Sequence, residues 1–257
     1  MSDLFASHDV LPPAFQQWFD QRGWQVHGHQ LDMIKTAAAG KSSLLVAPTG
    51  TGKTLAGFRP SLVDLAATPQ KSGLHTLYIS PLKALAVDIE LNLAKPIAEM
   101  ELPIRAETRT GDTTPAKRKR QRENPPPVLM TTPESLELML TWDDAAEFFS
   151  GLQCIILDEL HALAGNKRGD LLSLSLARLR RLAPGARSIG LSATVASSEN
   201  LRCWLDPDPD NVEIIRAART TEPEISILAR DADLHWAGHS AAWAVEDIYR
   251  LIAANKT

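Results

Sequence analysis

Short apolar segments alternate with longer segments of helical pattern along most of the chain. In the short segments apolar residues follow one another without interruption, which is typical of strands buried on both faces of a sheet. This alternation predicts right-handed crossovers and a mostly parallel sheet with helices on both faces, so the expected fold class is α/β. The expected strands are residues 43–47, 76–80, 105–108, 127–131, 154–158 and 188–192, and the expected helices are residues 29–39, 53–66, 84–99, 133–140 and 170–182.

Two proline-rich stretches interrupt the alternation. Three consecutive prolines at 125–127 predict a surface loop, because proline fits neither a helix interior nor a central strand. The segment 206–210 reads DPDPD and marks a change in composition, followed by strand-like residues 212–215 and 224–229 and a helical pattern at 241–254. We expect residues 1–221 to form one domain, and residues 222–257 to be a linker and the first elements of a second lobe whose remainder is missing from the sequence.

Composition places the chain among ordinary folded proteins. Of its 257 residues, 44% are hydrophobic and 23% are charged, which excludes a mostly disordered or coiled-coil chain. No apolar run approaches the ~18 residues that span a bilayer, and no secretory signal is visible, so no membrane partner is expected. The cysteines and histidines lack metal-ligand spacing, which predicts a reduced, cytoplasmic protein without a zinc site. The formal net charge of −4 does not exclude a local nucleic-acid groove.

The strongest chemical signal is a glycine-rich segment between an expected strand and an expected helix. Residues 47–54 read APTGTGKT, which matches a Walker A loop except that Ala47 replaces its first glycine. Glycines let backbone N–H groups turn inward around phosphate oxygens, and the following helix presents its positive end to the same anion. Lys53 is expected to reach the β- and γ-phosphates, and the Thr54 hydroxyl to ligate Mg²⁺. The predicted ATP-binding residues of the loop are Thr49, Gly50, Thr51, Gly52, Lys53 and Thr54.

A second expected strand ends in two carboxylates. Four apolar residues at 154–157 precede Asp158 and Glu159, and ligands of open α/β sheets bind at the carboxyl ends of the strands. We expect Asp158 to hold Mg²⁺ and Glu159 to orient and deprotonate the attacking water, with Lys53 as the third catalytic residue. This interpretation requires both carboxylates to lie within ~10 Å of the Lys53 ammonium, the reach of one triphosphate–metal unit.

Further motifs follow in order along the chain. The Walker A loop, DELH at 158–161 and SAT at 192–194 resemble motifs I, II and III of superfamily 2 helicases of the DExH-box type. Residues 78–85 (YISPLKAL), 109–112 (RTGD) and 131–136 (TTPESL) are similar to motif Ia and to two further motifs of the first lobe that contact nucleic acid. Within the superfamily, residues 81–88, 131–140 and 158–179 are most similar to the large helicase-related (Lhr-type) group and its ligase-associated DExH-box branch.

The resemblance implies a first RecA-like lobe of the P-loop NTPase type that uses ATP and Mg²⁺. It also implies 3′-to-5′ movement on single-stranded DNA, duplex unwinding, and a DNA-repair setting with partners such as an ATP-dependent DNA ligase. The second RecA-like lobe and the C-terminal domains of the same protein would complete the motor. DNA is favoured over RNA as the track, and an RNA helicase of the same superfamily stays open, because the expected contacts are mostly to phosphates.

The resemblance also assigns residues to base recognition and to coupling. Gln30 matches the residue that reads adenine, with Trp24 or Phe19 as a stacking partner, although the proline that commonly precedes this glutamine is absent. The alternative is that Gln30 only starts a helix. The expected coupling residues between the phosphates, the track and a second lobe are His161, Ser192 and Thr194. For the histidine, a plain polar loop position is the alternative.

Nucleic-acid contacts are expected from the family motifs and from a basic turn after the DELH segment. Contacts through backbone N–H groups, hydroxyls and one lysine give affinity without base sequence and weaken with salt. The expected set is Pro81, Leu82, Lys83, Arg109, Thr110, Gly111, Thr132, Pro133, Glu134, Ser135, Lys167 and Arg168, of which the last two form the basic turn and could equally be solvated. The basic run 117–122 (KRKRQR) is interpreted as a solvated face rather than a nucleic-acid patch.

Two other functional classes compete with a motor enzyme. A transporter nucleotide-binding domain is disfavoured because the chain has no LSGGQ-like segment. A binding module with little turnover has more support, because the Gln-x-x-Gly-Arg-x-x-Arg segment that supplies the family's arginine finger does not occur in the chain. Such a finger is worth ~10³–10⁵ in turnover. We therefore expect the isolated 257 residues to bind ATP–Mg²⁺ weakly, to hydrolyse it very slowly and not to unwind DNA.

Overall fold

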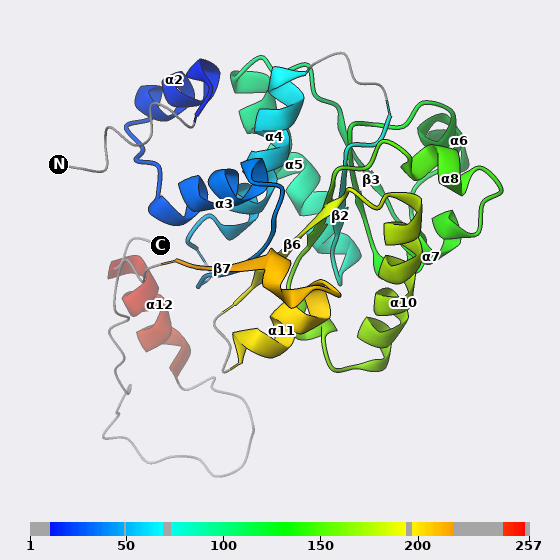
Figure 1. Ribbon diagram of the computed structural model, residues 1–257. Coiled ribbons are helices and arrows are strands. Elements are labelled where there is room, and N and C mark those ends of the chain that lie inside the picture. The colour runs from blue at the N-terminus through cyan, green and yellow to red at the C-terminus, as the bar shows by residue number, and fades with distance from the viewer. Residues whose placement is uncertain (1–10, 49, 69–72, 194–196, 218–243, 255–257) are drawn as a thin grey trace, which may run out of the picture. The chain divides into compact units, whose positions relative to one another are not determined.

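The computed structural model describes residues 11–48, 50–68, 73–193, 197–217 and 244–254. The chain divides into two compact units, residues 1–219 and residues 220–257. The described part of the second unit contains helix α12 (Val245–Ala254), and the strand expected at 224–229 lies outside the described residues. The assignment of this unit to a second lobe stays a prediction. The sheet and the candidate site belong to the first unit (Figure 1).

A parallel sheet forms the centre of the first unit. Its seven described strands run in the order β3-β4-β2-β5-β6-β1-β7, and all of their pairings are parallel. The predicted α/β fold is therefore confirmed, and each strand expected within the described residues begins and ends within one residue of the observed one. The strands are β1 (Ser42–Val46), β2 (Thr76–Ile79), β3 (Ala106–Arg109), β4 (Val128–Thr131), β5 (Cys154–Leu157), β6 (Arg187–Ser192) and β7 (Val212–Arg216).

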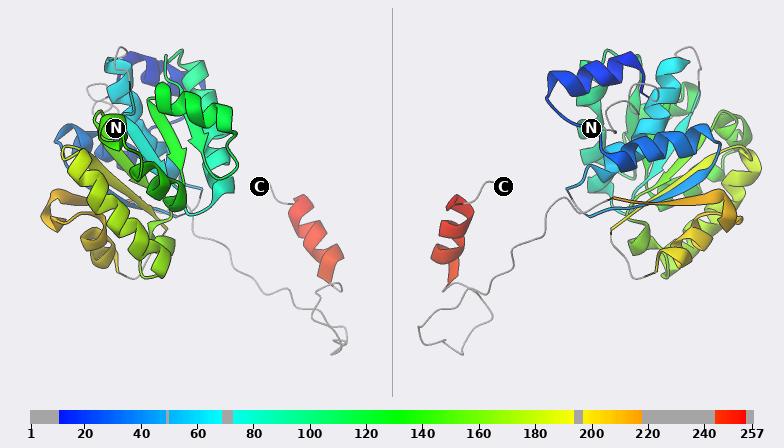
Figure 2. Two further views of the ribbon diagram at one scale, coloured as in Figure 1. Left: turned by 90° about the vertical axis from the view of Figure 1, so that its right-hand side faces the viewer. Right: turned by 60° about the vertical axis from the view of Figure 1, so that its left-hand side comes forward.

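Helices cover both faces of the sheet, so that α3 and α11 lie on opposite sides of strand β7 (Figures 1 and 2). Successive side chains of a strand point to opposite faces, and one apolar run therefore feeds two cores. The first core joins strand residues such as Leu45 and Ile156 to α2 (Pro13–Gln21), α3 (Gly28–Ala38), α4 (Lys53–Ala67) and α5 (Lys83–Glu99). The second joins Leu44 and Ile155 to α7 (Pro133–Leu140), α8 (Ala145–Phe149), α9 (Leu160–Leu163), α10 (Lys167–Leu182) and α11 (Ser198–Leu205).

Several short elements are not among those expected from the sequence, and three of them, with five residues or fewer, are too short for a helical period to be read. The unexpected elements are α2, α8, α9, α11 and the 3₁₀ turn Pro209–Asn211. The chain packs them into place through buried side chains such as Phe15, Phe149 and Leu205. Among the described residues, no helix has both the length and the apolar character needed to span a membrane.

Helix α10 begins three residues earlier than the sequence predicts. Lys167 and Arg168, expected to form a basic turn, lie instead in the first turn of this helix, so that prediction is wrong. The reason is a cap: the Asn166 side chain accepts a hydrogen bond from the Gly169 N–H at 2.9 Å. Gly169 also passes so close to the preceding segment that a Cβ built on it would lie 1.9 Å from the Leu163 carbonyl oxygen.

Replacement of Gly169 by alanine is expected to destabilise the protein by about 2 kcal/mol or more, because the new methyl group overlaps backbone that cannot move aside. The steric cost outweighs the better helix propensity of alanine, about 1 kcal/mol. Thermal unfolding measures the loss. Gly185→Ala is the matched control, since a Cβ at Gly185 meets nothing within 4 Å; equal melting temperatures for the two variants would contradict the close approach at Gly169.

Candidate nucleotide and nucleic-acid site

The carboxyl ends of the parallel strands gather the motif residues at one edge of the sheet. β1 leads into the glycine-rich loop, β5 leads into Asp158, and β6 ends with Ser192. Because β6 pairs with β1 on one side and with β5 on the other, the loop and the carboxylates flank a single strand. β2, β3 and β4 end in the segments that carry the expected nucleic-acid motifs.

The glycine-rich loop has the backbone conformation that its composition predicts. Gly50 and Gly52 have φ angles of 82° and 72°, in the left-handed region that favours glycine. The Thr51 hydroxyl donates to the Pro48 carbonyl at 2.8 Å and closes the turn. Gly52 is the residue before α4, so the first N–H groups of that helix face the loop. Thr49 lies outside the described residues.

Ala47 shows why the departure from the Walker A pattern is tolerated. Its side chain is fully buried and belongs to the first core, so the methyl group packs away from the phosphate side. Its N–H donates to the Ser192 carbonyl at 3.0 Å, which extends the β1–β6 pairing to the start of the loop. This bond places Ser192, an expected coupling residue, beside the loop.

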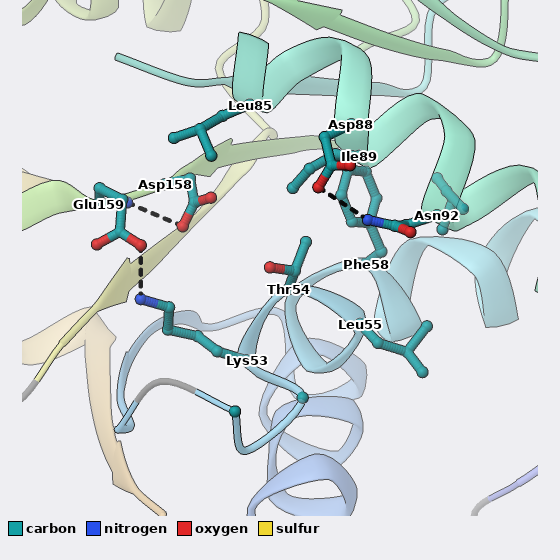
Figure 3. A pocket seen from close by; sticks show the side chains of 13 residues that line it. Lys53, Thr54, Leu55, Phe58, Leu85, Asp88, Ile89, Asn92, Asp158 and Glu159 are labelled. Atoms are coloured by element: carbon teal, nitrogen blue, oxygen red, sulfur yellow. Dashed lines mark hydrogen bonds and ion pairs between the residues drawn. The ribbon is translucent and has the colours of Figure 1, made fainter. Parts of the chain in front are cut away.

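Lys53 and Glu159 form an ion pair at this edge (Figure 3). Lys53 Nζ lies 2.9 Å from Glu159 Oε1, although the two residues are 106 positions apart, and only 8% of the lysine side chain is exposed. A cavity of about 400 Å³ opens beside the pair, between α4 and α5. Its lining includes Gly50, Gly52, Lys53, Thr54, Asp88, Asp158 and Glu159. One cavity thus contains both carboxylates, the lysine and the Thr54 hydroxyl.

Asp158 is buried and held from two sides. The Tyr78 hydroxyl donates to Oδ2, and the Glu159 N–H donates to Oδ1 at 2.9 Å. Burial raises the pKa of Asp158, while the hydrogen bond from Tyr78 acts in the opposite direction. Burial and the nearby Asp158 charge raise the pKa of Tyr78, so its hydroxyl stays a donor. Sequence reasoning did not single out Tyr78; the available signal was a hydroxyl-bearing aromatic residue near the end of an otherwise apolar strand.

Glu159 has a strained backbone. Its φ and ψ angles are 47° and 45°, the left-handed region that residues with a Cβ rarely adopt. Such conformations cost about 1–3 kcal/mol and persist where the surroundings over-determine them. Here the turn leads directly from β5 into α9 and directs the carboxylate toward Lys53.

His161 connects Glu159 to the end of β6. Its Nδ1 lies 3.2 Å from the Ser192 hydroxyl and accepts the Ala193 N–H at 3.3 Å. Because Nδ1 is an acceptor, the proton of the neutral ring sits on Nε2, which lies 3.5 Å from Glu159 Oε2. Two of the three expected coupling residues therefore contact each other, and the third, Thr194, lies outside the described residues.

Gln30 starts helix α3 and also lies beside the glycine-rich loop. Its Oε1 accepts the His27 N–H at 3.1 Å, which completes a capping box, and accepts Arg59 Nη1 at 2.9 Å. These donors occupy both lone pairs of the amide oxygen, so the orientation of the amide is set. Its Nε2 is turned toward Gly52, 3.3 Å from where a Cβ would stand. Gln30 thus caps the start of α3, as the alternative interpretation expected, and its amide N–H group still faces the glycine-rich loop.

Arg59 is a residue that sequence reasoning missed. Its guanidinium is buried, stacks over the Phe19 ring at 4.7 Å, and leaves Nη2 without a hydrogen-bond partner among the described residues. Burial lowers the pKa of Arg59 to about 9. Phe19 is therefore buried beneath Arg59 as well as packed in the core, whereas Trp24, the other expected stacking residue, is 55% exposed.

The expected nucleic-acid residues divide into exposed and internal ones. Lys83 lies over Gly111 and pairs with Asp112, its Nζ 3.1 Å from Oδ1, so motif Ia and the RTGD turn are adjacent. Arg109 is turned inward: Nη1 donates to the Arg118 carbonyl at 2.8 Å, and the guanidinium stacks over Trp142 at 4.6 Å. Leu82, Lys83, Gly111, Glu134 and Lys167 are exposed, whereas Pro81, Thr110, Thr132, Pro133 and Ser135 are buried.

The basic run 117–122 is largely neutralised within the protein. It forms most of helix α6 (Pro115–Glu123), beside strand β3. Each cation has an internal partner: Lys117–Glu90, Lys119–Glu123, Arg120–Glu107 and Arg122–Asp144 are ion pairs, and Arg118 donates to the Thr110 and Gly111 carbonyls. This arrangement agrees with a paired surface face rather than a patch that binds phosphates.

The donor set fits a triphosphate and a magnesium ion. The loop offers a lysine and glycine backbone in the conformation that turns N–H groups inward. The Thr54 hydroxyl and the Asp158 carboxylate line the same cavity, and such oxygen ligands are those that Mg²⁺ prefers. Glu159 lies beside both and keeps its Oε2 close to His161. The arrangement can hold a phosphate chain and activate water next to it.

Comparisons with known proteins agree with this geometry. The family model described as DEAD/DEAH box helicase matches residues 27–201. The Lhr helicase/uracil glycosylase of Escherichia coli (strain K12) is 38% identical over an alignment of 258 positions, gaps included, which covers 93% of this chain and 17% of that protein. The ATP-dependent helicase Lhr-Core of Methanocaldococcus jannaschii is 36% identical over an alignment of 236 positions, which covers 86% of this chain and 28% of that protein.

A solved structure gives the same picture. The Mycobacterium smegmatis helicase Lhr bound to ssDNA and AMP-PNP superposes with a TM-score of 0.74 and 39% identity, over 80% of this chain and 28% of that one. The chain thus spans less than a third of the length of these relatives. The resemblance to superfamily 2 helicases and to the Lhr-type group is confirmed, and the likeness to the ligase-associated branch stays a prediction.

Replacement of Asp158 by asparagine is expected to stabilise the protein at pH 7–8 by about 1 kcal/mol. The folded-state pKa of Asp158 is raised, so stability falls as the pH rises from the ordinary value of 3.8 through the raised value, and asparagine removes that loss. Thermal unfolding at several pH values measures the difference, which should vanish below about pH 4. Asp32→Asn, at an exposed position on α3, is the control. An Asp158→Asn variant that is less stable than the parent at pH 8 would contradict the expected loss of stability from the buried Asp158 carboxylate.

Proposed function

Because the chain belongs to the DEAD/DEAH box helicase family, we propose that it is the first RecA-like, ATP-binding lobe of an ATP-dependent helicase or translocase that moves on single-stranded DNA. The observation that carries this proposal is the Lys53–Glu159 ion pair at 2.9 Å, in one cavity with Thr54 and Asp158. It joins the phosphate-binding loop to the acidic strand end, as hydrolysis of a triphosphate requires.

The motif residues in and around the cavity have proposed parts in binding and hydrolysis. The backbone of Gly50–Lys53 and the Lys53 ammonium hold the phosphates, and Gln30 contacts the base through its amide. Thr54 and Asp158 hold Mg²⁺, which when bound would neutralise charge on the phosphate oxygens. Glu159 accepts a proton from the attacking water, and His161 Nε2 holds the carboxylate in place.

The Lys53–Glu159 ion pair also suggests how binding of a triphosphate prepares Glu159 to accept a proton. In the structure the Lys53 ammonium occupies Glu159 Oε1, so this oxygen is engaged by the lysine rather than by a water molecule. A triphosphate bound in the loop competes for the ammonium and leaves Glu159 with His161 as its remaining neighbour. Breaking the Lys53–Glu159 ion pair would therefore couple nucleotide binding to activation of the Glu159 carboxylate.

The track and the partners are proposed from the relatives. The Mycobacterium smegmatis helicase Lhr was solved bound to ssDNA, which supports DNA as the track of this chain as well. We infer 3′-to-5′ movement, a DNA-repair role in the cytoplasm, and partners that include a second RecA-like lobe, C-terminal domains and a repair protein such as an ATP-dependent DNA ligase. The arginine finger belongs to the second lobe in this family, so the isolated chain would act as an ATP- and nucleic-acid-binding module with very slow turnover.

ATP turnover by the full-length protein with single-stranded DNA, single-stranded RNA or no nucleic acid tests this function. We expect DNA to stimulate the rate by at least about tenfold, as for a motor that reaches its active form on the track. Glu159→Gln should lose more than about 99% of the turnover and retain ATP binding, because the amide cannot accept the proton. Stimulation by RNA alone would make the protein an RNA helicase, and Glu159→Gln with unchanged turnover would remove the proposed base.

The basic run is expected to contribute nothing to binding of the track. A triple variant with Lys117, Lys119 and Arg120 changed to alanine should keep the parental dependence of DNA affinity on salt, because these cations are paired internally. Titrations of single-stranded DNA across a range of salt concentrations measure it. If all three bound phosphates, the log–log slope would fall by about 2. Near-ultraviolet circular dichroism of the variant checks that loss of the Arg120–Glu107 pair leaves the fold intact.

A further inference from the structure

One arginine side chain bridges segments that lie far apart in the sequence. Arg168 Nε and Nη2 donate to Glu134 Oε1 and Oε2 at 2.5 and 2.9 Å, and Arg168 Nη1 donates to the Pro81 carbonyl at 2.5 Å. A guanidinium is planar, so this two-pronged pair fixes the carboxylate in orientation as well as in distance. Arg168 is 34 residues from Glu134 and 87 residues from Pro81.

The bridged segments follow three neighbouring strands: one is the loop that contains Pro81, and the other two are the first turns of helices α7 and α10. Pro81 follows β2, Glu134 follows β4, and Arg168 begins α10 after β5, and these strands lie side by side in the order β4-β2-β5. The same segments carry residues that the family motifs predict to contact the track: the exposed Lys83 follows Pro81 by two positions, and Thr132, whose side chain is buried, precedes Glu134 by two. One guanidinium therefore joins all three segments at their starts, while Ser175 and Arg178 of α10 hold α7 farther along through Glu137 and the Leu140 carbonyl.

Charge complementarity explains why the pair forms. Glu134 lies in the first turn of α7, where a negative charge is favourable, whereas Arg168 lies in the first turn of α10, where the positive helix end disfavours a cation. The hydrogen bonds to Glu134 raise the pKa of Arg168, and the same bonds lower the pKa of Glu134. The two charges neutralise each other, so a phosphate would have to break the fork, and would meet a carboxylate, in order to bind Arg168.

From this geometry we propose that Arg168 is a positioning residue, which clamps the segments after β2, β4 and β5 into one nucleic-acid surface, and that it does not itself bind a phosphate. The inference rests on the proposed function, because it concerns the track side of the same lobe. It reassigns both Arg168 and Glu134, which the family resemblance placed among the nucleic-acid contacts.

Salt titrations of single-stranded DNA binding by the full-length protein separate the two roles. For a clamp, Arg168→Ala and Glu134→Ala each weaken binding by about tenfold, the slope of log affinity against log salt is unchanged, and the double variant is no weaker than either single one. For a phosphate contact, Arg168→Ala lowers the slope by about 0.7, and Glu134→Ala strengthens binding because it removes a repulsive charge. The second pattern would overturn the clamp.

Arg168→Lys provides the decisive conservative variant. Lysine keeps the positive charge but cannot form the two-pronged pair, so a clamp predicts a loss similar to that of alanine, whereas a phosphate contact predicts near-parental affinity. Melting temperatures within a few degrees of the parent show that each variant is folded; if an alanine variant unfolds, Arg168→Lys and Glu134→Gln give the same comparison. A parent protein that binds no single-stranded DNA would refute the proposed function itself, whereas a bound parent with the phosphate pattern refutes only the clamp.

Discussion

The contact between Lys53 and Glu159 is the interaction on which the rest of the site depends. It joins the loop after β1 to the turn after β5, and it can form only because β6 pairs with both strands. The register aligns Val46 with Ser192 and Leu157 with Gly190, so the carboxyl ends of all three strands reach the same edge. A slip of one residue would turn the strand side chains to the opposite face and exchange the two cores.

The same edge concentrates the features that oppose stability. Asp158 carries a carboxyl group out of water, Arg59 carries a buried cation with one nitrogen unbonded among the described residues, and Glu159 has a left-handed backbone. Each of these costs free energy that the two apolar cores offset, and each is tied to a donor or acceptor that directs it toward the cavity or the loop. The proposed hydrolysis of a triphosphate accounts for these residues, because such a reaction needs charges that are held and partly desolvated.

Strand β2 and the loop after it contact both the nucleotide cavity and the segments that carry the nucleic-acid motifs. Tyr78, within the strand, donates to Asp158 on the nucleotide side, and Pro81, three residues later, accepts from Arg168 on the track side. The paired basic face of α6 lies farther out, against β3, and its cations are used to hold the RTGD turn and the neighbouring helices. Charged side chains therefore have different roles at the strand ends and on α6, and only the contacts of each residue distinguish the two roles.

The amino-acid sequence by itself determined the α/β class, the strand positions, the glycine-rich loop and the Asp158–Glu159 strand end. These depend on the local order of apolar, glycine and charged residues, which sequence periodicity records directly. Only the tertiary structure decided that Tyr78 supports Asp158, that Arg59 sets the amide of Gln30, and that Arg168 pairs with Glu134 instead of standing in an open turn. Those contacts join segments that are separated by 29 to 80 residues. The pairing of parallel strands brings Tyr78 to Asp158 and the start of α10 to Glu134, and the packing of α3 against α4 brings Gln30 to Arg59, so the sequence near each residue does not reveal them.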